Sequence, residues 1–343
     1  MGRKNVTFGA LKAALTTTAL CTTFYAGAAA AGGTITTFDP PGSGATYPWT
    51  VSDNGTISGF WYDTAKAKTY SFVRAADGSI STFNHKKSKV TAAYGINSKG
   101  VATGYWTNID GDFPGFTYTP AGKMKIFRVS GASNGTYPEI INKNGDIGGA
   151  WYDDYDVVHG FLRTGKGSIA SFDVSGDAYG TMPAAMNASD VITGHYDDIS
   201  GLVHGFVRTS DGTIATFDAP NDTYGTFAQA INSSGIIAGY YDDNADEAHG
   251  FLRDQAAIIS TFDPSGSTGT FVECINDKGD VSGYYEDAGG VSHGFLRAPD
   301  GTVSTFDVAG ASGTFPNTIN KKGAITGWYT DADGNYHGFL RTK

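Results

Sequence analysis

The sequence predicts an all-β fold, a seven-bladed β-propeller, on the strength of three observations. A unit of about 45 residues recurs seven times, each unit holds four short strand-like segments, and glycine is abundant. Forty-eight of the 343 residues are glycine, about twice the usual share. No stretch shows a sustained apolar period of 3.6 residues, so we expect strands and turns rather than helices.

Two phenylalanine motifs mark the repeat. The first ends a strand in a Thr-Phe-Asp-like element, at Phe38, Phe83, Phe127, Phe172, Phe217, Phe262 and Phe306. The second belongs to a His-Gly-Phe element, at Phe72, Phe116, Phe161, Phe206, Phe251, Phe295 and Phe339. The copies fill the chain from about Gly33 onward, so we expect one domain over residues 31–343.

Each unit divides into four strands joined by recognisable turns. In the fifth copy the strands are "GTFAQAIN", "GIIAGYYD", "HGFLR" and "AIISTFD". Asn-x-x-Gly turns follow the first strand and Asp-Gly turns follow the third, both of which supply the positive φ angles of tight hairpins. Four strands per unit, seven times over, is typical of a seven-bladed propeller, although periodicity alone leaves a β-prism or a solenoid open.

The two ends of the chain suggest how the ring closes. The repeats open with a lone strand, "GTITTFD", and end with "HGFLR". We therefore expect the N-terminal strand to join the last blade as its fourth strand, which would leave no exposed edge. The long Asp-rich loops then share one face of the disc, opposite the short turns.

The first thirty residues differ in kind from the rest. Arg3, Lys4 and Lys12 accompany an apolar, Ala/Thr-rich stretch that ends in "AGAAAAGG". This pattern predicts a secretory signal peptide over residues 1–30 and a secreted protein, because the apolar run is too short for a membrane anchor. Only Cys274 would remain after cleavage, which excludes an intramolecular disulfide.

The charge of the chain excludes some classes of partner. Its formal net charge is -10. Such a surface repels phosphate backbones and anionic lipid, so we expect neither nucleic acid binding nor membrane insertion. We expect a monomer that meets an extracellular glycan or an envelope protein.

The consensus of His-Gly-Phe-Leu-Arg, Thr-Phe-Asp and Gly-Tyr-Tyr-x-Asp elements resembles the bacterial extracellular HAF-type repeat proteins, named for a His-Ala/Gly-Phe motif. The resemblance covers all seven units, from about Gly33 to Lys343. It implies an extracellular repeat protein and carries over no catalytic residue, because the family is largely uncharacterised. Tyr70 and Pro114 stand where the other units have His, so the first two units do without that side chain.

The repeated histidines follow an Asp-rich loop in five units. The pairs are Asp153 with His159, Asp198 with His204, Asp243 with His249, Asp287 with His293, and Asp331 with His337. Residues at the two ends of a hairpin loop face each other, so we expect an Asp–His hydrogen bond that fixes the loop. The alternative is that each pair binds a ligand in a repeated pocket. A zinc site is disfavoured because the histidines are spread around a ring.

Metal and catalytic signals are few. Asp331, Asp333 and Asn335 form an oxygen-rich turn that could bind Ca²⁺, but Asp-Gly is also ordinary turn chemistry, and no other cofactor is indicated. The main break in symmetry, "HKKSK", makes His85, Lys86 and Lys87, together with His195, the candidates for a catalytic or anion-binding site. No standard hydrolase or metalloprotease constellation is visible, so we expect a binding protein rather than an enzyme.

Two further positions recur in every or nearly every unit. One aromatic position on the second strand is expected to pack between blades, and the more variable position before it, occupied by residues such as Phe60 and Tyr105, could face a ligand. The arginine that ends the third strand, such as Arg208, is expected to pair with Asp at the short turns.

Three functions remain open from the sequence. The first is a secreted, multivalent binding propeller that recognises extracellular carbohydrate. The second is a polysaccharide-degrading enzyme, a lyase or glycoside hydrolase, with one site on the loop-rich face. The third is a structural module of the cell envelope without a small ligand.

Overall fold

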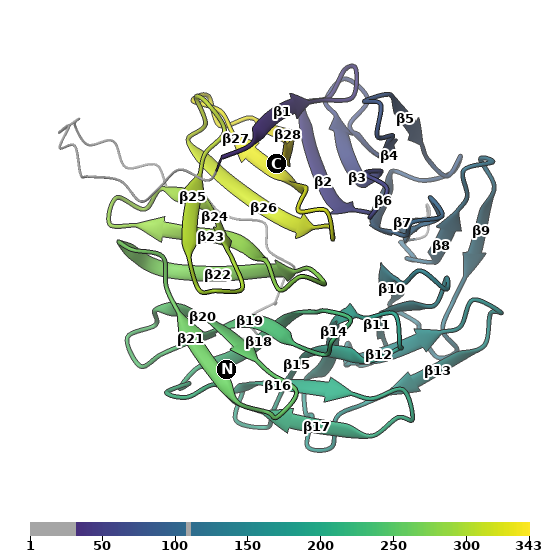
Figure 1. Cartoon of the computed structure of the whole chain (residues 1–343). Helices are drawn as coiled ribbons and strands as arrows, with labels where there is room; N and C mark the ends of the chain where they lie inside the picture. Colours follow the sequence, from purple (N-terminus) through teal and green to yellow (C-terminus); the bar gives the residue numbers. More distant parts are fainter. Residues whose placement is uncertain (1–31, 108–110) are drawn as a thin grey trace, which may run out of the picture.

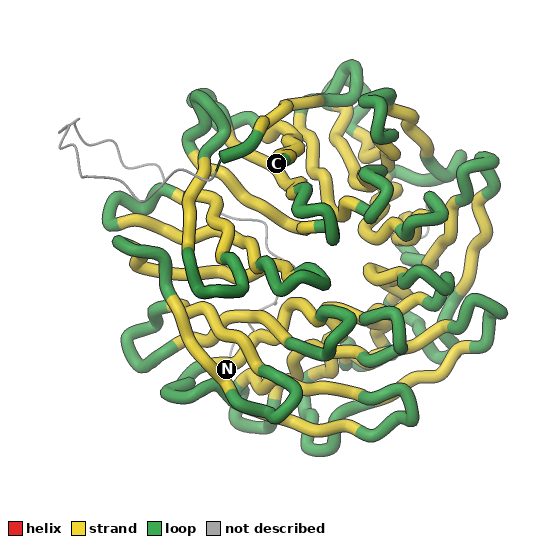
Figure 2. Tube along the Cα trace, in the orientation of Figure 1, coloured by secondary structure: helices red, strands yellow, loops and turns green. Residues whose placement is uncertain are grey.

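The computed structural model describes residues 32–107 and 111–343. The predicted signal peptide lies outside the described residues. These residues form 28 strands joined by turns and loops, without a helix (Figure 2). The described part of the chain therefore contains no helix that could cross a membrane. The all-β prediction is confirmed.

Strand β1 (Thr34–Phe38) precedes seven units. Unit 1 consists of β2 (Ala45–Val51), β3 (Ile57–Asp63), β4 (Lys68–Arg74) and β5 (Ile80–Phe83). Unit 2 consists of β6 (Val90–Ile96), β7 (Ala102–Thr107), β8 (Gly115–Tyr118) and β9 (Met124–Phe127). Unit 3 consists of β10 (Gly135–Ile141), β11 (Ile147–Tyr152), β12 (Val158–Arg163) and β13 (Ile169–Phe172). Units 4 and 5 consist of β14 (Gly180–Met186), β15 (Ile192–Asp197), β16 (Val203–Arg208) and β17 (Ile214–Phe217); and β18 (Gly225–Ile231), β19 (Ile237–Asp242), β20 (Ala248–Arg253) and β21 (Ile259–Phe262). Units 6 and 7 consist of β22 (Ser267–Ile275), β23 (Val281–Asp287), β24 (Ser292–Arg297) and β25 (Val303–Phe306); and β26 (Gly313–Ile319), β27 (Ile325–Thr330) and β28 (Tyr336–Thr342).

Strand pairing is antiparallel within each unit, and β1 supplies the fourth strand of unit 7. It pairs with β28 from Thr34 opposite Thr342 to Phe38 opposite Gly338. Figure 1 shows the units around a common centre, with the purple β1 beside the yellow β28. A single parallel bridge, Ala45 to Tyr336, joins unit 7 to unit 1, as equivalent bridges join other neighbouring units.

An asparagine amide crosses every junction between neighbouring units. Asn232 shows the arrangement: its Oδ1 accepts the backbone N–H of Ser234 at 3.0 Å, which closes the turn, and its Nδ2 donates to the carbonyl of Asn276 in the next unit at 3.3 Å. The seven donations run from Asn54 to Ser98, Asn97 to Asn142, Asn144 to Ala188, Asn187 to Asn232, Asn232 to Asn276, Asn276 to Asn320, and Asn320 to Ser52. The last one links unit 7 to unit 1.

The core lies between units and is built on the two phenylalanine motifs. The Phe of each His-Gly-Phe element is fully buried: Phe72, Phe116, Phe161, Phe206, Phe251, Phe295 and Phe339. Phe206 meets the Thr-Phe-Asp ring of the preceding unit, Phe172, edge-on at 6.2 Å between ring centroids. A Cβ on Gly205 would lie 2.8 Å from the Phe217 ring, so only glycine fits between the two motifs.

The recurrent arginines do not pair with Asp, contrary to the prediction from the sequence. The Arg208 guanidinium lies over the Phe172 ring, 4.9 Å from its centroid, and donates to the carbonyl of Thr209. Arg74, Arg163, Arg253, Arg297 and Arg341 lie over the equivalent rings. These contacts add a cation–π attraction to the packing of neighbouring units.

Candidate functional site

Each repeated histidine bonds to the aspartate of the Thr-Phe-Asp element, not primarily to the loop aspartate. The Nδ1 distances are 2.8 Å from His159 to Asp173, 2.7 Å from His204 to Asp218, 2.9 Å from His249 to Asp263, 3.0 Å from His293 to Asp307, and 2.7 Å from His337 to Asp39. Register explains this choice, because Gly160 lies opposite Phe172 on the neighbouring strand and so brings His159 beside Asp173. The sequence prediction missed this partner.

The loop aspartates lie farther away, on the other ring nitrogen. The Nε2 distance to the loop carboxylate is 3.6 Å in units 3, 4 and 5, 3.5 Å in unit 6 and 3.2 Å in unit 7. The loop carboxylate mainly closes its own turn: Oδ1 of Asp243 accepts the backbone N–H of Ala245 at 2.8 Å and of Glu247 at 3.1 Å. The predicted Asp–His pair therefore forms a direct hydrogen bond only in units 6 and 7.

The face of each imidazole is also occupied. His249 packs against Tyr241 with 5.3 Å between ring centroids, and His337 packs against Tyr329 at 5.1 Å. Tyr241 is 5% exposed, so this aromatic position belongs to the core, as predicted. With Nδ1 bonded to the Thr-Phe-Asp carboxylate, Nε2 facing the loop carboxylate and one face of the ring covered, the repeated histidine acts as a latch between two strands and a loop.

The latch makes a prediction that depends on pH. Burial alone would lower the pKa of His249, but its hydrogen bond to Asp263, together with the charges of Asp263 and of the nearby Asp243, raises the pKa above its ordinary value of 6.5. The pKa values of His204 and His337 are raised for the same reasons. Because the folded pKa exceeds the unfolded one, this stabilisation is complete below pH 6.5 and is lost as pH rises through the raised pKa.

We expect His249→Ala to lower the free energy of unfolding by about 1 kcal/mol at pH 5.5 and by less at pH 8.5. Urea denaturation at the two pH values measures the difference. Asp263→Asn, which keeps a hydrogen-bond acceptor but removes the charge, serves as the control. An equal loss at both pH values would show that only the packing against Tyr241 matters.

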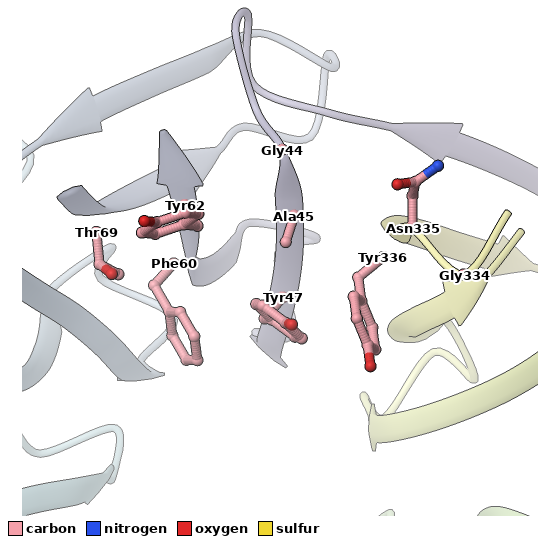
Figure 3. A pocket seen from close by; sticks show the side chains of 9 residues that line it. All are labelled: Gly44, Ala45, Tyr47, Phe60, Tyr62, Thr69, Gly334, Asn335 and Tyr336. Carbon is pink, nitrogen blue, oxygen red and sulfur yellow. The ribbon is translucent and has the colours of Figure 1, made fainter. Parts of the chain in front are cut away.

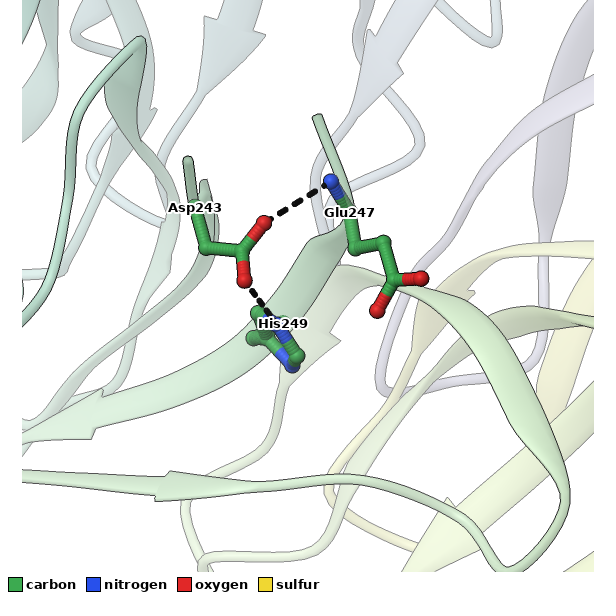
Figure 4. Close-up of side chains that lie close together, drawn as sticks. All are labelled: Asp243, Glu247 and His249. Atoms are coloured by element: carbon green, nitrogen blue, oxygen red, sulfur yellow. Dashed lines mark hydrogen bonds and ion pairs between the residues drawn. The ribbon is translucent and has the colours of Figure 1, made fainter. Parts of the chain in front are cut away.

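In unit 5, one group of side chains could hold a metal ion. Asp243, Glu247 and His249 each offer a ligand atom within 4.8 Å of the others (Figure 4). The position of Glu247 is occupied by Val157, Leu202, Val291 and Asn335 in units 3, 4, 6 and 7. The recurrent feature is thus the latch, and Glu247 is an exposed addition to it.

The turn predicted as a calcium site uses its oxygens internally. Oδ1 of Asp331 accepts the backbone N–H of Asp333 at 2.9 Å and of Asn335 at 2.8 Å. Its Oδ2 accepts the Asn335 side-chain amide at 2.9 Å and Nε2 of His337 at 3.2 Å. These donors hold the pKa of Asp331 well below its usual range, which fits the turn interpretation.

The structure separates the predicted catalytic residues. His85 stacks on Trp106 at 3.7 Å between ring centroids, where burial and the charge of Lys87 lower its pKa, while Lys86 and Lys87 are exposed. His195 lies on β15 of unit 4 against Phe227, where burial lowers its pKa to about 4. No described contact joins His85 to His195, so these residues do not converge on one site.

Two glutamates with raised pKa values were missed by the sequence reasoning. Glu139 and Glu273 occupy equivalent bulge positions on the innermost strands of units 3 and 6. Burial raises the pKa of each to about 7. The surrounding rings, such as Tyr94 and Tyr105 near Glu139, supply no positive charge to offset that burial.

A pocket of about 490 Å³ opens between units 7 and 1 (Figure 3). Its lining consists of Gly44, Ala45, Tyr47, Phe60, Tyr62, Thr69, Gly334, Asn335 and Tyr336. Figure 3 shows the rings of Phe60, Tyr47 and Tyr336 in a row. The Tyr47 centroid lies 5.2 Å from that of Phe60 and 5.3 Å from that of Tyr336, and Tyr62 is 40% exposed. The pocket thus offers aromatic faces beside hydroxyl and amide groups.

Strand register positions these groups. Tyr47 on β2 lies opposite Phe60 on β3, and Tyr62 lies opposite Thr69 on β4. Tyr336 begins β28 in the neighbouring unit, just before the repeated histidine. Burial and the neighbouring Tyr336 hydroxyl raise the pKa of Tyr47 to about 12, so it stays a neutral hydrogen-bonding group. The variable second-strand position, Phe60 in unit 1, lines this pocket.

Comparison with known proteins shows the fold. No family model matches the chain, and no curated protein matches it. A streptogramin B lyase structure is similar, with a TM-score of 0.60 and 14% identity over 90% of this chain and 97% of that one. So is the β-propeller domain of the Trilobed protease from Pyrococcus furiosus, with a TM-score of 0.61 and 10% identity over 86% of this chain and 95% of that one. The fold is a β-propeller.

A virginiamycin B lyase from Staphylococcus aureus, bound to quinupristin, is similar to the propeller to a comparable degree. Its TM-score is 0.57, with 15% identity over 90% of this chain and 99% of that one. Identities this low establish the architecture alone. The Pyrococcus domain is described as having an open velcro topology, whereas β1 pairs with β28 in this propeller.

Proposed function

We propose that the chain is a secreted, closed, seven-bladed propeller that binds extracellular carbohydrate through the pocket between units 7 and 1. Three contacts between these units support the closed ring: the bridge from Ala45 to Tyr336, the donation from Asn320 to Ser52, and Arg74 over Phe38. The composition of residues 1–30 and the resemblance to extracellular HAF-type proteins support secretion.

The aromatic pocket is the observation that carries the proposal. A pyranose ring has an apolar face of C–H bonds and a rim of hydroxyl groups, so it fits a site that combines flat rings with polar groups. Phe60, Tyr47 and Tyr336 supply the rings. The Thr69 hydroxyl and the Tyr62 hydroxyl line the same space and can pair with sugar hydroxyls. Asn335 lines the pocket as well, with its side-chain N–H donated to Asp331 and its amide oxygen left as an acceptor. The acidic chain favours a neutral glycan over a polyanionic one.

A glycan array with the exported chain, in buffer with calcium, tests the proposal. We expect saturable binding to one glycan class, and a loss of affinity of about tenfold or more in the double variant Tyr62→Ala/Tyr336→Ala. Tyr224→Ala is the control, because that tyrosine is exposed, as Tyr62 is, but does not line the pocket. An array without any bound glycan would contradict the proposal and leave a protein partner in the envelope as the alternative.

A further inference from the structure

One departure from the repeat falls just before the position that holds the recurrent histidine in units 3 to 7. Tyr336 of unit 7 and Phe113 of unit 2 are aromatic there. The other five units carry Thr69, Val158, Val203, Ala248 and Ser292. Because the other five units carry small or aliphatic residues at this position, the two aromatic residues distinguish the junction of units 7 and 1 and the junction of units 2 and 3 from the rest.

At two more positions, the residues at these same two junctions differ from those of the other units. On the innermost strand, only unit 1 and unit 3 carry tyrosine, Tyr47 and Tyr137, in place of Ala92, Met182, Phe227, Phe271 and Phe315. At the end of the second strand, the same units carry Tyr62 and Tyr152, in place of Thr107, Asp197, Asp242, Glu286 and Thr330. Three departures therefore coincide at the junctions 7–1 and 2–3.

The rings have matching geometry at both junctions. Tyr336 lies 5.3 Å from Tyr47 with an interplanar angle of 37°, and Phe113 lies 5.6 Å from Tyr137 at 33°. The preceding unit adds a ring at a steep angle, as it also does at three other junctions: Trp328 meets Tyr47 at 68°, and Tyr105 meets Tyr137 at 69°. The junction between units 2 and 3 thus reproduces the aromatic framework of the pocket.

The residues around the rings are partly equivalent at the two junctions and partly different. Gly334 and Gly111, with φ angles of 82° and 84°, precede the aromatic residue by two positions at the two junctions. The position of Asn335 is occupied by Asp112, whose carboxylate pairs with Arg128. Ala150 replaces Phe60, so the junction 2–3 has one ring fewer. It offers a charged pair where the pocket offers an amide and a third ring.

We infer that the junction of units 2 and 3 is a second carbohydrate site, which makes the propeller bivalent for glycans. This inference rests on the proposed function. The site would stack a pyranose against Phe113, Tyr137 and Tyr152 and bind its hydroxyls through the Asp112 carboxylate and the Arg128 guanidinium, groups that suit pairs of adjacent hydroxyls. Two sites on one rigid ring raise the avidity for a polymer without a tighter single site.

Binding stoichiometry tests the inference. The probe is a panel of monovalent methyl glycosides of hexoses, pentoses and N-acetylhexosamines, titrated by calorimetry against the full chain. The variants are Tyr62→Thr and Tyr152→Thr, each of which installs a residue that units 2 and 7 already carry at that position and so preserves the fold. Tyr224→Ala is the control, and circular dichroism melting verifies folding.

We expect two sugars per chain in the wild type and in the control, one in each single variant, and none in the double variant. A stoichiometry of one that Tyr62→Thr abolishes and Tyr152→Thr leaves unchanged would overturn the second site while leaving the proposed function intact. Absence of binding to every glycoside and to the glycan array would overturn both.

Discussion

Deletion of β1, residues 34–38, is expected to lower the free energy of unfolding by about 5 kcal/mol or more. The deletion removes a five-residue ladder against β28 and the Phe38 side chain, which packs on Phe72 at 6.0 Å and lies under Arg74 at 4.9 Å. Each backbone hydrogen bond of the ladder contributes about 1 kcal/mol, and the half-buried Phe38 ring, with its cation–π contact to Arg74, contributes about 2 kcal/mol. Chemical denaturation followed by circular dichroism measures the change.

A single substitution tests the packing of β1 while keeping the strand itself in place. Phe38→Ala is expected to cost about 2–3 kcal/mol, the same as Phe172→Ala in an internal unit. The two rings are half-buried and make matching contacts, Phe38 with Phe72 and Arg74, and Phe172 with Phe206 and Arg208. A negligible cost at Phe38 beside a full cost at Phe172 would show that β1 does not pair with β28 in solution.

Phe206→Ala is expected to destabilise the protein by about 3–5 kcal/mol. The ring is fully buried between units 3 and 4, and the surrounding strands are too constrained by their ladders to collapse into the space left behind. The loss therefore combines the transfer of a phenyl group to water with the cost of a cavity. Thermal unfolding monitored by circular dichroism and calorimetry provides the measurement.

Phe206→Leu is the control for that substitution, with an expected cost of about 1–2 kcal/mol, because it keeps most of the apolar volume. A cost for Phe206→Ala below about 1 kcal/mol would mean that neighbouring units pack less tightly than this geometry requires. A graded loss from leucine to alanine would instead show that the His-Gly-Phe motif is retained for packing between units.

The fold was predictable because local chemistry and the long repeat agree. The Asn-x-x-Gly turns predicted hairpins, and Asn232 closes such a turn through its own side chain. The lone "GTITTFD" strand predicted a partner for the C-terminal "HGFLR", and β1 lies beside β28. These signals depend only on neighbours in the sequence or on the count of strands, so they can be read without coordinates.

The candidate site was less predictable because it depends on register across strands. The loop aspartate is close to His249 in sequence, yet the shorter hydrogen bond goes to Asp263, fourteen residues farther along, because antiparallel pairing brings it there. The repeat pattern does not indicate the pocket for another reason. Tyr62 and Tyr336 differ from the residues that most units carry at these positions, so a comparison of the units for what they share passes over them. Only the structure shows that departures in two different units meet at one junction.

The asparagine donations have a consequence for how such a chain can change in length. Each unit presents an amide donor to the next unit and a carbonyl acceptor to the previous one, always in the same direction. Where the same asparagine position recurs in consecutive units, as at Asn232, Asn276 and Asn320, a duplicated unit would therefore meet a donor and an acceptor that match its own.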